Sequence, residues 1–156
     1  MKILGYMGTS ITSSLIKIQT RSKYSHIGVM LHDGSVVEAW QGTGVRQIEN
    51  AFIGHADNTL IDVFSIKSIN TDFDEPAATK YLLEQIGKKY DYRSVWRFLS
   101  RRDAPDNESL FCSEMAELTL IAGGLRLLNG SPSEHSPRDT LLSPILNFDT
   151  TIWKDN

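Results

Sequence analysis

Short stretches rich in apolar and β-branched residues, several alternating with polar ones, predict a chain built largely from β-strands. We predict strands over residues 2–7, 24–31, 35–40, 44–48, 60–66 and 145–153. Asp33-Gly34, between the second and third of these stretches, favours a hairpin connection. The sequence therefore predicts a sheet in which at least one pair of strands is antiparallel.

Helices are predicted where apolar residues recur three and four positions apart. The candidates are residues 10–20, 74–86, 95–99, a helix from Cys112 to the Gly123-Gly124 pair, and one starting at Ser136-Pro137-Arg138-Asp139. The helix over 74–86 has the clearest ends, because Asp74 can cap it and Gly87 can terminate it. Strands followed by helices, without strict alternation, indicate an α+β fold with an antiparallel sheet packed against helices. We assign residues 1–156 to a single domain.

The hairpin around Asp33-Gly34 has two possible registers, which place Glu38 differently. A two-residue turn would put Glu38 on the same face as three apolar residues of the preceding strand, where a carboxylate is costly. A three-residue loop over 32–34, with Gly34 in the left-handed conformation, shifts the pairing by one residue. Glu38 then shares a face with His26 and Trp40. We predict this second register, which places a carboxylate one diagonal step from His26.

Cys112 is the only cysteine in the chain and lies at a predicted helix start. The partial positive charge of a helix N-terminus favours a thiolate, and a histidine can serve as the base for a thiol nucleophile. The prediction is therefore that Cys112 and His26 form a catalytic pair, with Glu38 holding the imidazole in one tautomer. The alternative is a small cysteine in the core and a solvated glutamate on an edge strand.

Composition limits the classes of partner and the cellular location that we expect for the protein. A net charge of −3 with scattered basic residues gives no footprint for nucleic acid. One cysteine excludes an intrachain disulfide, and no stretch has the length of a signal peptide or a membrane span, so we expect a cytoplasmic protein. The four histidines lack ligand-like spacing. We accordingly expect no metal and no cofactor, with His32 and His55 solvated.

Five short segments occur in an order that resembles a known enzyme superfamily. They are Tyr24-Ser25-His26-Ile27-Gly28-Val29, Val37-Glu38-Ala39, Gly87-Lys88-Lys89-Tyr90-Asp91-Tyr92, Phe111-Cys112-Ser113-Glu114 and Ser136-Pro137-Arg138-Asp139-Thr140-Leu141-Leu142. Together they resemble the circularly permuted, NlpC-type branch of the papain-like cysteine hydrolases. That branch includes the YiiX-like bacterial proteins and relatives of lecithin:retinol acyltransferase. The resemblance implies a papain-like fold with the nucleophile at a helix N-terminus.

The resemblance also implies a role for each matching residue. Cys112 would attack the carbonyl of an amide or ester, His26 would act as base and then as acid, and Glu38 would orient His26. Tyr90 or Tyr92 would line the site.

The departures from the superfamily leave the substrate open. Arg93-Ser94 stands where a glycine pair often follows the tyrosine element, and Phe111 replaces the aspartate that precedes the cysteine in many peptidases. Trp40 and Tyr92 would suit either an acyl chain or a peptide. The reaction is therefore open between a peptidase or amidase, an esterase and an acyltransferase, and a non-catalytic binding domain is the alternative of another class. The oligomeric state is also open.

Overall fold

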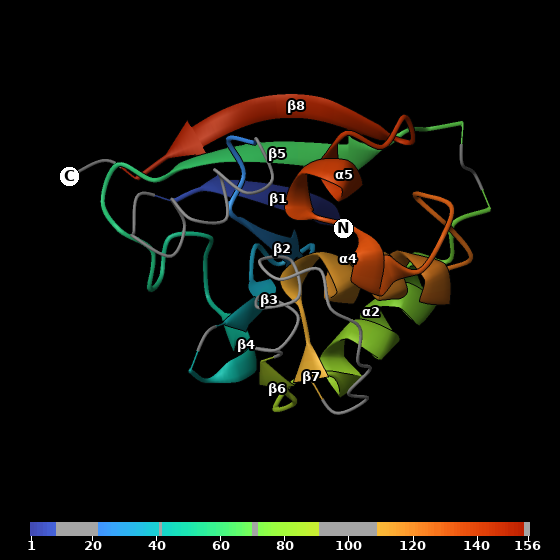
Figure 1. Cartoon of the computed structure of the whole chain (residues 1–156), viewed down its shortest axis with the longest axis horizontal. Helices are drawn as coiled ribbons and strands as arrows, with labels where there is room; N and C mark the ends of the chain where they lie inside the picture. Colours follow the sequence, from blue (N-terminus) through green and yellow to red (C-terminus); the bar gives the residue numbers. More distant parts are fainter. Residues whose placement is uncertain (9–21, 41, 70–71, 91–108, 155–156) are drawn as a thin grey trace.

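A six-stranded antiparallel sheet forms the centre of the protein in the computed structural model, which describes residues 1–8, 22–40, 42–69, 72–90 and 109–154. The strand order is β4-β3-β2-β1-β5-β8, and Figure 1 shows the strands following one another from β8 at the top to β4 below. Their bounds are β1 (Lys2–Met7), β2 (His26–Met30), β3 (Val36–Trp40), β4 (Gly44–Ile48), β5 (Leu60–Ile66) and β8 (Leu146–Trp153). Each of the six strand predictions is confirmed, with some ends shorter by one or two residues.

Helices cover part of one face of this sheet. They are α2 (Glu75–Glu84), α4 (Cys112–Ala122) and α5 (Pro137–Leu141), with a short 3-10 helix η1 (Pro132–Glu134). Helix α4 packs against β2, β3 and α2. A two-stranded parallel pair, β6 (Lys89–Tyr90) and β7 (Ser109–Leu110), lies beside β4 and was not predicted. The α+β architecture is as predicted.

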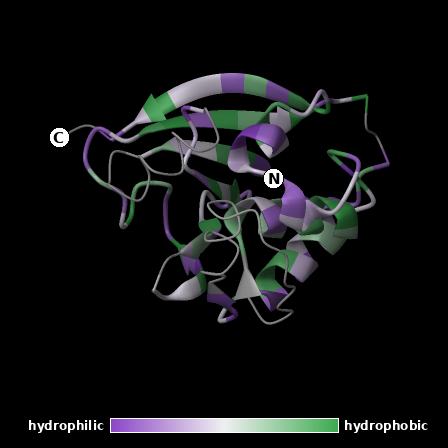
Figure 2. Ribbon diagram, viewed as in Figure 1, coloured by the Kyte–Doolittle hydropathy of each residue, from purple (hydrophilic) through white to green (hydrophobic). Residues whose placement is uncertain are grey.

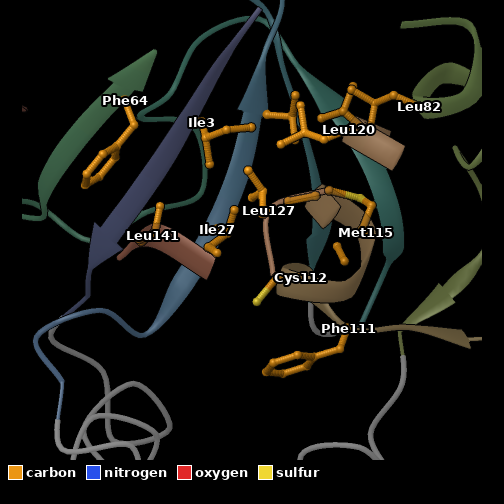
Figure 3. Close-up of a cluster of buried hydrophobic side chains, with 14 of the residues drawn as sticks. Ile3, Ile27, Phe64, Leu82, Phe111, Cys112, Met115, Leu120, Leu127 and Leu141 are labelled. Carbon is orange, nitrogen blue, oxygen red and sulfur yellow. The ribbon is translucent and has the colours of Figure 1, made fainter. Parts of the chain in front are cut away.

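Apolar residues fill both faces of the sheet. On the helix-covered face, Ile27 and Val29 of β2 and Val37 of β3 belong to the same buried cluster as Met115 and Leu120 of α4 (Figure 3). A second cluster on the other face includes Tyr6, Val36 and Ile61. The outer strand β8 is mostly exposed and mixes polar with apolar residues (Figure 2), whereas its neighbour β5 is mostly buried. The central strands therefore lie between two clusters of buried residues.

The β2–β3 hairpin has the predicted three-residue loop. Val29 faces Val37 and Gly28 faces Glu38 across the pair, and the Leu31 N–H donates to the Ser35 carbonyl at 2.9 Å. Gly34 has φ 86°, a left-handed conformation that glycine adopts without a steric penalty. The register predicted from the cost of placing Glu38 among apolar residues is therefore confirmed.

The predicted helix starts are also found, whereas α2 ends at Glu84 with Gln85 as its C-cap, earlier than the predicted end at Gly87. Asp74 caps α2 by accepting from the Ala77 N–H at 2.9 Å, and Ser136 forms a capping box with Asp139 at the start of α5. The helices predicted over 10–20 and 95–99 lie outside the described residues. Across the described segments, no helix has the length and apolarity needed to span a bilayer.

Candidate active site

Glu38 is the centre of a cluster of charged and aromatic side chains on the sheet. It is 0% exposed, and its Oε2 lies 2.9 Å from His26 Nε2 and 3.0 Å from His55 Nε2. Its Oε1 accepts from Arg46 Nε at 3.0 Å and Arg46 Nη2 at 2.6 Å. Burial opposes ionisation, but the bonds to the two imidazoles outweigh it and hold the pKa of Glu38 well below its ordinary value. An ionised carboxylate only accepts, so both Nε2 atoms carry protons that point at it.

Gly28 makes room for this cluster, directly opposite Glu38 on β2. A Cβ atom at Gly28 would lie 2.8 Å from Val36 Cγ1 and 3.2 Å from Tyr6 Cε2, closer than ordinary contact. The absence of a side chain therefore lets the Tyr6 ring lie over β2 next to the histidines.

Cys112 is the first residue of α4, as predicted, and is 1% exposed. Figure 3 shows it at the helix start, beside β2 and Ile27. Cys112 is close enough to His26 to raise the pKa of its ring, and since Nε2 of that ring faces Glu38, Nδ1 is the nitrogen left for the sulfur. Cys112 is therefore both a buried member of the core cluster and the partner of a histidine.

His26 occupies the first position of β2, between Cys112 and Glu38. Burial of the ring would lower its pKa, but the hydrogen bonds to Cys112 and Glu38 and the charges of both raise the pKa of His26 well above its ordinary value. Trp40 contacts the ring edge-on at a centroid distance of 5.6 Å, and Tyr6 lies tilted at 5.3 Å. Burial and the Glu38 charge raise the pKa of the Tyr6 hydroxyl. The sequence-predicted residues Cys112, His26, Glu38 and Trp40 thus meet at one place.

His55 and Arg46 complete the cluster and were not predicted as site residues. The expectation that His55 is solvated is wrong, because its side chain is 6% exposed and its ring stacks on Tyr6 at 4.0 Å. The polar sequence around His55 gave no sign that residues 49–59 fold back over the sheet. Arg46 lies directly opposite Glu38 in the β3–β4 pair and over the Trp40 ring at 4.3 Å. Continuing the predicted antiparallel pairing from residues 35–40 to the next predicted strand, residues 44–48, would have placed Arg46 opposite Glu38.

The remaining candidate residues lie elsewhere. His32 is exposed, as expected, and pairs with Glu75, while His135 contacts Glu117 at 2.8 Å. The backbone of Tyr90 belongs to β6, and Tyr92 lies outside the described residues. The expected lining role of these two tyrosines stays a prediction.

Comparison with known proteins shows the fold. No protein-family model and no curated protein matches this chain. The structure is similar to a crystal structure of the metalloprotein YiiX from Escherichia coli O157:H7, with a TM-score of 0.72 and 19% sequence identity. The match covers 98% of this chain and 97% of that one. The chain therefore has a YiiX-like fold, whereas the NlpC-type, papain-like relationship and its activity stay predictions.

Proposed function

We propose that this protein is a thiol hydrolase that cleaves an amide or ester through an acyl-enzyme on Cys112. The observation that carries the proposal is the place of His26, whose Nε2 bonds the buried carboxylate of Glu38 at 2.9 Å and whose pKa is raised by the neighbouring Cys112. A nucleophile, a base and a group that orients the base are the three parts that covalent acyl transfer requires.

Each residue has a defined part in the reaction. His26 Nδ1 accepts the Cys112 proton, and the sulfur attacks the carbonyl carbon to form a carbon–sulfur bond. The bond to the leaving nitrogen or oxygen then breaks, and the leaving group takes the proton from His26. Water then attacks the thioester while His26 accepts one of its protons, the carbon–sulfur bond breaks to release the carboxylic acid, and the sulfur takes the proton from His26 to restore the thiol. Backbone N–H groups at the start of α4 can stabilise the developing oxyanion.

Glu38 supports this cycle through the other ring nitrogen of His26. Its carboxylate fixes the proton on Nε2, which keeps Nδ1 free to accept from Cys112, and it stabilises the positive ring that follows. Arg46 and His55 in turn hold Glu38 in place from both of its oxygens.

The proposal is tested by trapping the acyl group. The protein is mixed with panels of muropeptides, acyl amides and phospholipids, and the intact mass is measured; we expect one class to leave an acyl adduct. Cys112→Ser should leave no thioester, and His26→Ala should slow adduct formation. His32→Ala is the matched control, because His32 is exposed and contacts Glu75 and not the Glu38 cluster, and it should behave like the wild type. Failure of every panel would favour a binding domain that keeps the fold without catalysis.

Hydrolysis and acyl transfer share these steps and differ only in the final acceptor. Release of the adduct in buffer indicates a hydrolase. An adduct that persists until an added amine or alcohol is supplied indicates an acyltransferase.

A further inference from the structure

We infer that His26, Glu38 and His55 also form a binding site for a divalent transition-metal ion such as zinc. The three residues each offer one ligand atom, and these atoms lie within 4.8 Å of one another, the one such group found in the segments that the structure describes. The inference shares two residues with the proposed hydrolase site but does not depend on catalysis.

The spacing of the three ligand atoms suits a metal. Both Nε2 atoms lie about 3 Å from Glu38 Oε2, at 2.9 and 3.0 Å. Ligands bonded to zinc at 2.0–2.2 Å are themselves separated by roughly 3 Å or slightly more. All three atoms lie within 4.8 Å of one another, so the two rings would have to turn toward a shared ion, with the two Nε2 protons released.

The surrounding residues hold these ligands as outer-shell partners commonly do. Arg46 binds Oε1 of Glu38 and leaves Oε2 for the ion. Tyr6 stacks on the His55 ring and fixes its orientation. The cluster thus has ordered first ligands and a second layer that orients them.

A second observation comes from the Tyr6 hydroxyl. It is fully buried next to His55 and has no hydrogen-bond partner among the described residues. Buried hydroxyl groups are nearly always paired in proteins, so an unpaired one beside two imidazoles and a carboxylate points to a ligand at this place. A water molecule carried by the metal would supply such a partner.

The donor set defines the class of ion. Two imidazoles with one carboxylate select zinc, cobalt, nickel or copper over calcium and magnesium, which prefer oxygen ligands. Arg46 also neutralises part of the Glu38 charge, which further disfavours a hard cation held mainly by charge.

The test is metal binding by the full chain, measured without any substrate. After loading with Zn²⁺ and gel filtration, elemental analysis should find about one zinc per chain in the wild type. His55→Ala should weaken zinc affinity by more than about 100-fold, beyond the loss seen for outer-shell changes. The matched control His32→Ala should keep the wild-type affinity, the outer-shell change Cys112→Ser should still retain zinc, and Ca²⁺ should not compete.

A measurement on the unmutated protein covers the case in which His55→Ala fails to fold. In long-range nitrogen NMR of the imidazole rings, Zn²⁺ should shift the Nε2 signals of two of the four histidines, His26 and His55. Shifts confined to His32 or His135, no retained zinc, or equal loss of zinc in His32→Ala would each overturn the inference. Retained zinc in Cys112→Ser separates this result from any failure of the proposed hydrolase.

Discussion

Glu38→Gln isolates the part that one buried charge plays in the site. The substitution keeps the size of the side chain, but Glu38 only accepts hydrogen bonds, two from Arg46 and one from each histidine. A glutamine that keeps its oxygen toward Arg46 must turn its NH₂ group toward two ring N–H groups. The conflict is relieved if each imidazole moves its proton to Nδ1. In His26 that nitrogen faces Cys112, so the ring can no longer accept the thiol proton.

The expected size of the effect follows from the ionisation of an ordinary thiol. An unperturbed cysteine is only a few per cent thiolate at neutral pH. The proposed transfer of the Cys112 proton to His26 would leave a thiolate, so loss of that transfer in Glu38→Gln should reduce the thiolate signal at pH 7 by up to about 30-fold, or about 2 kcal/mol. The free energy of unfolding should also fall by about 3 kcal/mol, because Arg46 loses its counter-charge in a buried site.

Ultraviolet thiolate absorption measures this directly, as the difference between each protein and the same protein carrying Cys112→Ser. The chain has one cysteine, so the signal reports Cys112 alone, and burial of the sulfur does not affect it. Glu117→Gln is the matched control, since Glu117 is a second buried glutamate that contacts a histidine, on the same helix as Cys112. It should lose stability and keep its thiolate. An unchanged thiolate signal in folded Glu38→Gln, or an equal loss in Glu117→Gln, would refute the role of Glu38.

Three further predictions concern stability. Burial opposes the charge of Asp62, but the hydrogen bonds from Lys23, Thr151 and Tyr24 lower its pKa. Its contribution to the free energy of unfolding is therefore full above about pH 4 and is lost as the pH falls. Asp62→Asn should thus flatten the acid side of a plot of that free energy, measured in urea, against pH, and an unchanged plot would contradict this. Gly28→Ala should cost about 1–3 kcal/mol through overpacking against Val36, and a melting temperature equal to that of the wild type would show that the sheet can relax. Ser136→Ala should cost about 1 kcal/mol in chemical denaturation by removing the α5 cap, an effect that Ser136→Asp, which can still cap, should largely avoid.

Local rules explain why so much of the fold was predictable. The hairpin register depended on the cost of placing Glu38 among apolar neighbours, and its loop on a glycine with φ 86°. The start of α4 at Cys112 and the caps of α2 and α5 likewise depended on residues close in sequence. Two of the three residues in the proposed triad lie on that one hairpin, so their contact could be predicted without knowing the rest of the fold.

His55 could not be predicted for the opposite reason. Its partner Glu38 is 17 residues away, and the intervening loop has no periodic pattern that fixes where a side chain points. The expectation of a solvated histidine rested on the polarity of its immediate neighbours. The structure buries the ring against Tyr6 of β1, a contact that depends on the order of strands in the sheet. Spacing of the histidines along the chain also missed the proposed metal ligands, since one of the three is a glutamate.

The two nitrogens of the His26 ring separate the two chemistries inferred for this site. Nδ1 serves the thiol, while Nε2 serves either the Glu38 carboxylate or a metal ion, and one nitrogen cannot serve both at once. Thiolate absorption in the presence of a chelator therefore reports the first chemistry, and zinc retention by Cys112→Ser reports the second. A protein that shows only the thiolate is a candidate hydrolase without a resident metal. One that shows only zinc uses the YiiX-like fold for a metal centre, and one that shows both can exchange the carboxylate contact of His26 for a metal bond.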